Sequence, residues 1–246
     1  MSQGETFPLT HFSMRSEAGR EEKELEEEKI LQSETRQKSL IQRYMLFIIG
    51  LFIAAMGVAF STKAGLGTSP VASVPYSVSL ISSLLTFGGW LNLWSVIQIG
   101  VQIALLRKKC NPVEIVIQTV LAFAYGYMTN FSCRLIDGLV VDTYPMQFLC
   151  MIVSCFILGL GIWIQFKGNV AMLPGEAMNR AISTVSGWRY ENIKIFFDVL
   201  YIVISAVLGL LFLGGLKGVR EGSIIAAVLI GNIIKLYNRI WDRIKK

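Results

Sequence analysis

The sequence predicts an all-α membrane protein with six transmembrane helices, arranged as two inverted three-helix repeats that each contain a short broken or re-entrant helix. Hydrophobic residues make up 53% of the 246 residues and charged residues only 16%, with a mean hydropathy of +0.55. A soluble domain of this length cannot bury so much apolar surface, so long uncharged runs indicate a bilayer. Internal recurrence is the second observation. Three positions return with a constant offset of 104 residues: Gly57, Lys63 and Pro70 recur as Gly161, Lys167 and Pro174.

Six apolar runs are the expected spans: Tyr44–Thr62, Trp90–Leu106, Ile115–Cys133, Thr143–Phe166, Val199–Leu216 and Gly222–Ile234. A span needs about 20 residues, so the last is short unless Lys235 snorkels and the helix continues to about Tyr237. Pro70–Leu85 and Pro174–Gly187 are too short or too polar to span, and each is expected to be a helix beginning at its proline.

The repeats are expected over residues 43–137 and 143–241. Each holds an odd number of strong spans, so the second copy lies upside down relative to the first. Many secondary transporters and some channels have this architecture.

Basic residues predict the orientation, with both termini cytoplasmic. With the N-terminus inside, the outer loops hold only four lysines and arginines: Lys63, Arg134, Lys217 and Arg220. The inner loops and C-terminus hold twelve: Arg107, Lys108, Lys109, Lys167, Arg180, Arg189, Lys194, Lys235, Arg239, Arg243, Lys245 and Lys246. This asymmetry also explains the net charge of +6 without nucleic acid, since the basic residues form no single face.

Residues 1–42 differ in composition from the rest and are expected to form a soluble, charged tail. They contain no apolar run typical of a cleaved secretory signal. The stretch from Arg20 to Arg43 is rich in Glu, Lys, Arg and Gln, which favours a solvated helix leading into the first span. A partner-binding coil is the alternative, although few aliphatic residues are available for it.

Motifs of the common hydrolases and of ATP hydrolysis do not occur, so we expect no enzyme, no cofactor and no metal site. The single histidine, His11, lies in the tail. The cysteines have no C-x-x-C spacing and are expected to act as small hydrophobic residues, namely Cys110, Cys133, Cys150 and Cys155.

The break after each first span supplies the candidate solute site. In the first copy, glycines are followed by Thr68, Ser69 at an expected N-cap, and Pro70 at the first helical position. In the second copy, Pro174 opens the helix and Glu176 stands in its first turn. If the copies are inverted, two positive helix ends approach a shared region suited to an anionic group. An interfacial loop followed by a helix lying flat is the alternative.

Charged residues of the second copy are further candidates. Glu176 and Arg180 share one helical face and form either a surface pair or a substrate counter-ion with its neutralising partner. Asp198 falls within the fifth span, where a carboxylate is costly unless paired, protonated or facing water. It is either a coupling carboxylate for protons or cations, or the i,i+4 partner of Lys194 near the headgroups.

Other polar residues are less specific. Glu114 and Glu221 open the third and sixth spans and are interpreted as complements of the helix dipoles. Five amides within spans are expected to bond between helices or, alternatively, to line a pore: Asn92, Gln98, Gln102, Gln118 and Asn232.

The chain resembles the YczE/YyaS/YitT-type bacterial integral membrane proteins over about Arg43 to Ile240. The resemblance rests on the stretch from Leu66 to Pro70, on Phe87-Gly88 and on the stretch from Gly222 to Asn232. In that family the proline is commonly followed by Trp-Asp, whereas Val71-Ala72 follows here, so the role of that acid is lost in the first copy. The resemblance implies a polytopic protein of the bacterial plasma membrane and supplies no substrate.

The leading functional hypothesis is a secondary transporter or permease for a small solute with an anionic group, embedded in the lipid bilayer. Its site would use Thr68, Ser69 and Pro70 with Pro174, Glu176 and Arg180, and Asp198 for coupling. The alternative is a non-transporting assembly or regulatory factor of another membrane protein. A polar cavity between the repeats that opens to one side would favour the transporter, and a dry, small-residue centre would favour the factor. The oligomeric state stays open.

Overall fold

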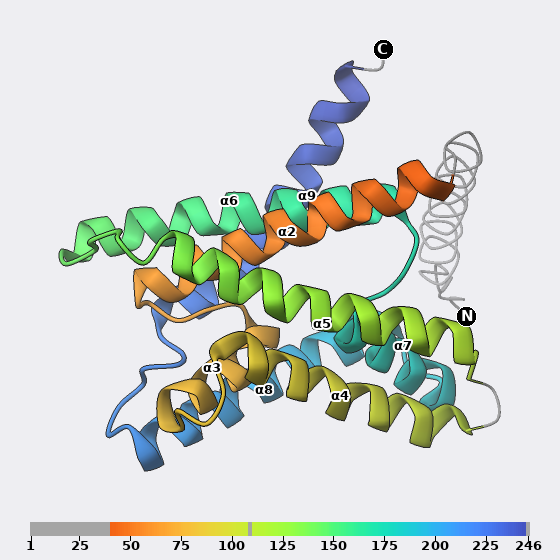
Figure 1. Cartoon of the computed structure of the whole chain (residues 1–246), viewed down its shortest axis with the longest axis horizontal. Coiled ribbons are helices and arrows are strands. Elements are labelled where there is room, and N and C mark those ends of the chain that lie inside the picture. Colours follow the sequence, from red (N-terminus) through yellow and green to blue (C-terminus); the bar gives the residue numbers. More distant parts are fainter. Residues whose placement is uncertain (1–39, 108–109, 245–246) are drawn as a thin grey trace, which may run out of the picture.

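The computed structural model describes residues 40–107 and 110–244, and the fold in these ranges is entirely helical (Figure 1). The expected tail, residues 1–42, lies outside the described residues except for 40–42. Eight helices occur in the described ranges: α2 (Leu40–Ala64), α3 (Pro70–Ile81), α4 (Phe87–Leu106), α5 (Pro112–Leu135), α6 (Tyr144–Gly168), α7 (Pro174–Ser186), α8 (Tyr190–Phe212) and α9 (Glu221–Ile244).

The offset of 104 residues reappears in the helix boundaries. Adding it to the limits of α2 gives the limits of α6, and adding it to the first residue of α3 gives that of α7. Both short helices begin at their prolines, as the sequence predicts, because proline is preset for the first helical turn. We call residues 65–69, between α2 and α3, the first break, and residues 169–173, between α6 and α7, the second break.

Five of the described helices are long and apolar enough to cross a membrane, namely α2, α4, α6, α8 and α9. The third expected span corresponds to α5, which is 24 residues long but is not among the five. Polar side chains such as Gln118 and Asn130 lower its hydropathy. The fifth expected span begins at Val199, whereas α8 already begins at Tyr190. The first turns of α8 carry charged residues, so an apolar run does not reveal that they are helical. Lys194 and Asp198 form an i,i+4 ion pair in these turns.

Helices α2 and α6 form the central pair and run in opposite directions (Figure 1). Their backbones touch at glycines: a Cβ on Gly57 would lie 2.5 Å from the Leu158 nitrogen, and one on Gly161 would lie 2.7 Å from the Ala54 Cα. Gly57 and Gly161 are the two repeat glycines of the sequence, and small residues let membrane helices approach this closely. The contact between α2 and α6 is therefore tightly packed.

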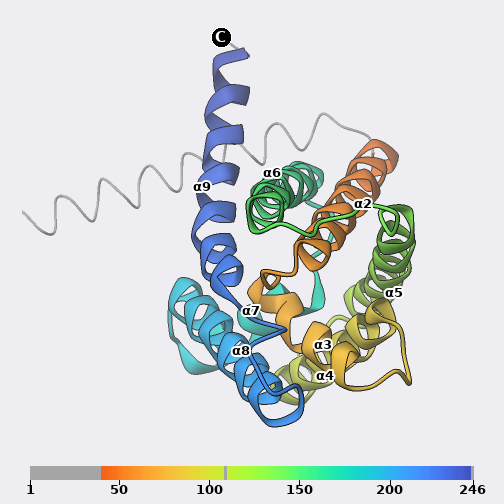
Figure 2. The same cartoon turned by 90° about the vertical axis from the view of Figure 1, so that its left-hand side faces the viewer.

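The short helices are exchanged between the halves. Helix α3 packs against α8 of the second half, and α7 packs against α4 of the first half. Figure 2 shows α3 enclosed among the long helices. The first turns of α3 and α7 meet, since a Cβ on Gly175 would lie 3.6 Å from Val71 Cγ1. Val71 and Gly175 are themselves 104 residues apart, so α3 and α7 touch at matching positions.

One packing relation is not repeated. Helices α4 and α5 lie in close contact, and glycines permit it: a Cβ on Gly126 would lie 2.5 Å from the Gly88 carbonyl oxygen. Asn130 strengthens this contact by accepting the Gly88 N–H at 2.8 Å and donating to Thr86 Oγ1 at 2.8 Å. Helix α9 packs against α6 as α5 packs against α2, but it makes no comparably close contact with α8, and Figure 2 shows it leading away from α8.

Candidate functional site

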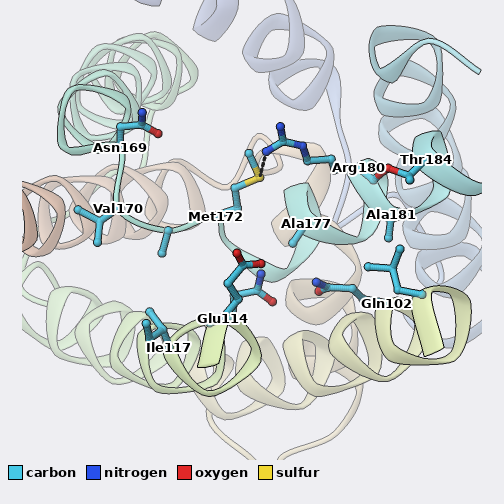
Figure 3. A pocket seen from close by; sticks show the side chains of 13 residues that line it. Gln102, Glu114, Ile117, Asn169, Val170, Met172, Ala177, Arg180, Ala181 and Thr184 are labelled. Atoms are coloured by element: carbon cyan, nitrogen blue, oxygen red, sulfur yellow. Dashed lines mark hydrogen bonds between the residues drawn. The ribbon is translucent and has the colours of Figure 1, made fainter. Parts of the chain in front are cut away.

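A cavity of about 300 Å³ lies between the halves, at the end of the molecule where α4 meets α5 (Figure 3). The first half contributes Gln102 and Leu106 from α4 and Glu114, Ile117 and Gln118 from α5. The second half contributes residues 169–172 of the second break and one face of α7, with Ala177, Arg180, Ala181 and Thr184. The volume is at the lower limit typical of small-molecule pockets.

The start of the second break is fixed by the end of α6 and by an arginine of α2. Helix α6 stops at Gly168, and Asn169 follows in the left-handed conformation with φ of 42°. Arg43 of α2 reaches the end of α6, where Nε donates to the Gly168 carbonyl oxygen at 3.0 Å and Nη2 to that of Asn169. These bonds satisfy carbonyls that the helix end leaves unpaired. The break is thereby fixed beside the cavity, with Asn169 and Met172 exposed at its mouth.

Buried amides form the deeper part of the wall made by α4 and α5. Gln102 and Gln118 are each 5% exposed, and the side-chain oxygen of each has no hydrogen-bond donor. Such orphaned acceptors are rare in proteins because their desolvation is not compensated. The sequence predicts that these amides either bond between helices or line a pore. Gln102 and Gln118 both line the cavity. Gln98 does bond between helices, since its Nε2 donates to Tyr201 Oη at 3.3 Å.

Two opposite charges lie at the mouth. Figure 3 shows Glu114 and Gln102 directed into the cavity from one side and Arg180 on the other. Glu114 stands in the first turn of α5, as its role as a dipole complement requires, and sequence reasoning missed that this turn borders a cavity. The Arg180 guanidinium donates to the Met172 sulfur at 3.6 Å, a weak acceptor. No ion pair of either charge occurs among the described residues.

Glu176, one helical turn before Arg180, does not line the cavity. The pair with Arg180 that the i,i+4 spacing permits is not formed among the described residues; Glu176 is half-buried toward α8 instead. Burial raises the pKa of the Glu176 carboxyl above its usual range, the Lys194 ammonium lowers it, and the Asp198 carboxylate raises it. Lys194 Nζ lies 3.5 Å from Asp198 Oδ2, so the pairing alternative for Asp198 is realised in the structure.

The candidate residues of the first copy lie away from the cavity. Thr68 is fully buried, and its Oγ1 lies 2.9 Å from Ser61 Oγ. Ser69 is the N-cap residue of α3 but makes no side-chain capping bond, and Pro70 is buried at the first helical position. Pro174 and Asp198 do not line the cavity either, so Arg180 is the one residue of the expected solute site that does.

The repeat lysines have local roles. Lys63 Nζ donates to the Asp137 carbonyl oxygen at 2.7 Å and lies 3.7 Å from its carboxylate, which ties the end of α2 to the end of α5. Lys167 Nζ lies 5.8 Å from the Trp163 ring centroid and 5.9 Å from that of Trp241, within reach of a cation–π interaction. Neither borders the cavity.

Comparison with known proteins agrees with the resemblance seen in the sequence. A family model described as a family of unknown function (DUF6198) matches residues 41–239. An uncharacterized protein of Bacillus subtilis (strain 168), YyaS, is 25% identical over 202 residues, which cover 82% of this chain and 94% of that protein. No solved structure matches the chain significantly. The chain is thus a polytopic, YyaS-type membrane protein and belongs to the family of unknown function DUF6198.

Proposed function

We propose that this protein is a secondary transporter of a small solute bearing an anionic group, and that its two halves are inverted repeats of three spans each. Helix α5 is the sixth span, with its polar side chains turned to the protein interior. The antiparallel pairing of α2 and α6 supports the inversion, because matched helices that both cross the bilayer in opposite senses belong to inverted copies. Helices α3 and α7 are the short broken elements.

The observation that carries the proposal is a cavity between the halves that is bordered by the second break and by the exposed residues Asn169, Met172 and Arg180. At the other end, the position related by 104 residues is sealed. The connection between α8 and α9 lies over the first break, where Val219 pairs with Gly67 and Arg220 Nη1 donates to the Gly65 carbonyl oxygen at 3.3 Å. A site accessible from one side, between halves that exchange their short helices, suits alternating access by rocking.

The orientation follows the basic residues. Both termini lie in the cytoplasm, the cavity opens to the cytoplasm, and the sealed end faces outward. Arg180 attracts the anionic group of the solute. Asp198 is the proposed coupling carboxylate, and its pair with Lys194 must then open when Asp198 takes up a proton or cation.

A non-transporting assembly factor is the second candidate, and the glycine contact between α2 and α6 favours it, since helices packed this closely leave no solute path between them. The polar cavity favours the transporter. A thermal-shift screen of small carboxylates, phosphates and amino acids, followed by uptake of every stabilising solute into liposomes, separates the two. Uptake supports the transporter, whereas protein that is stabilised by no solute and takes none up is the result expected of a factor.

The coupling role is tested in the same liposomes. Asp198→Asn removes the charge and keeps the size, so we expect gradient-driven accumulation to be lost while counterflow exchange continues. Accumulation at the wild-type level would reduce Asp198 to the structural partner of Lys194.

The inverted topology has its own test. Single cysteines at Lys63 and Lys167, in a background without native cysteines, should react with an impermeant maleimide from opposite sides of the membrane. Reaction of both from one side would contradict the inversion and leave the transport result standing.

A further inference from the structure

The cavity has two walls of opposite hydrogen-bonding character. Helices α4 and α5 contribute the Glu114 carboxylate and the amides of Gln102 and Gln118, whose side-chain oxygens are buried without a donor. Helix α7 presents the Arg180 guanidinium, which has only donors, and the structure gives it no carboxylate partner among the described residues. Figure 3 shows Glu114 and Gln102 on one side of the cavity and Arg180 on the other, with its guanidinium turned toward Met172.

A solute with a single charge suits only one of these walls. A simple anion on Arg180 would bring its charge toward Glu114 and leave the two amide oxygens without donors. A simple cation beside Glu114 would satisfy the amide oxygens but would be repelled by Arg180. A molecule that carries both groups satisfies both walls, because its ammonium group donates three hydrogen bonds and its carboxylate accepts the planar guanidinium.

We propose that the cavity binds a small zwitterion of the amino-acid class. Its carboxylate lies on Arg180, and its ammonium group donates to Glu114 and to the oxygens of Gln102 and Gln118. Its side chain is small and aliphatic, because the remaining lining includes Leu106, Ile117, Ala177 and Ala181. The inference names the substrate class of the proposed transporter and rests on that function for transport, whereas binding is tested independently of it.

Three probes with the same propyl side chain isolate the two charges. Norvaline carries both, pentanoate lacks the amino group, and butylamine lacks the carboxylate. Binding to the purified full-length protein is measured by calorimetry at neutral pH. We expect norvaline to bind at least about tenfold more tightly than either of the others, the ratio that one lost charged hydrogen bond produces.

Variants then assign each charge to a wall. Arg180→Gln should weaken norvaline binding about tenfold or more and shift the preference toward butylamine. Glu114→Gln should weaken it similarly and shift the preference toward pentanoate. The matched controls are Arg189→Gln and Glu191→Gln, which remove charges of the same kind from an exposed pair 3.7 Å apart outside the cavity and should leave binding unchanged.

Equal binding of pentanoate and norvaline would overturn the inference in favour of a plain anion site, and equal binding of butylamine would overturn it in favour of a cation site. Failure of all three probes to bind would also overturn it. Norvaline that binds but never enters liposomes would uphold the inference and remove the proposed transport function. Uptake of a solute with one charge, without norvaline binding, would uphold the transport function and overturn the inference of a zwitterion site.

Discussion

The first and second breaks occupy matching places in the two halves and lie in opposite surroundings. Thr68 in the first break is 0% exposed, whereas Met172, 104 residues later, is 37% exposed. Both breaks are anchored by an arginine of the other half, Arg220 for the first and Arg43 for the second. The anchors therefore do not explain the difference.

The connection between α8 and α9 explains the burial of the first break. Residues 213–220 separate α8 from α9 and lie over the first break, and a glycine fits this connection against α3: Gly218 lies against Ser77, whose Oγ is 2.5 Å from Ser205 Oγ. Helix α4 ends at Leu106 and α5 begins at Pro112, and Leu106 and Glu114 near these two ends line the cavity. The first break is thus covered by a connection, whereas the second break borders a cavity.

The largest expected effect compares matched substitutions in the two breaks. Gly67 has φ of +94°, and a Cβ there would lie 2.8 Å from the Arg220 nitrogen. Gly67→Val should therefore cost about 3 kcal/mol or more from strain and overpacking. Ala171→Val, at the matching position in the cavity wall, should cost less than about 1 kcal/mol.

Thermal unfolding of the purified variants measures this pair, and a cost of about 3 kcal/mol corresponds to a Tm lower by roughly 10 °C. Equal destabilisation by both substitutions would mean that the second break is as tightly packed as the first.

A medium effect is expected in cysteine accessibility. In a background without native cysteines, Met172→Cys should react with a water-soluble maleimide at least about tenfold faster than Thr68→Cys, since exposure sets the reaction rate. Rates are measured by mass spectrometry on protein in detergent, and reduced, unfolded samples serve as the control for intrinsic reactivity. Faster reaction at Thr68 would invert the assignment of the open and sealed ends.

The smallest effect concerns Glu176, whose counterpart in α3 is the buried Ala72. Burial raises the pKa of Glu176 in the folded protein, so the folded state binds the proton more tightly than the unfolded chain. Stability is therefore highest below the ordinary glutamate pKa and falls as the pH rises through the raised value. Glu176→Gln should raise Tm at pH 8, by about 2 °C or less, and have no such advantage near pH 4.

Thermal unfolding across this pH range measures the difference, with Glu191→Gln as the exposed control. A lower Tm for Glu176→Gln at pH 8 would mean that the attraction of Lys194 outweighs the burial of Glu176.

Much of the fold follows from the sequence because its signals are local. Apolar length predicted the long helices, and prolines 70 and 174 predicted where the short helices begin. The repeat glycines Gly57 and Gly161 indicated positions that matter in both copies, and they are the contact points of the central pair.

The cavity could not be predicted in the same way. Glu114, Gln102 and Gln118 lie on different helices, and only tertiary packing brings them to one wall. The i,i+4 spacing of Glu176 and Arg180 permits a pair, yet Arg180 contacts Met172 and lines the cavity, whereas Glu176 lies near Lys194 and Asp198 of α8. Helix α7 contacts α4 and α8 only once the two halves have assembled, so a local sequence pattern cannot predict these neighbours.

The exchange of α3 and α7 also determines when the chain can complete its structure during synthesis. Helix α3 packs on α8, which emerges from the ribosome more than a hundred residues later, so the first half enters the bilayer with this face of α3 uncovered. Membrane insertion and final packing are therefore separate events in time. A chain that stops after α5 would insert as far as its helices allow, but it would leave the Ser77 hydroxyl without its partner Ser205, and such an incomplete chain is a natural target for quality-control proteolysis.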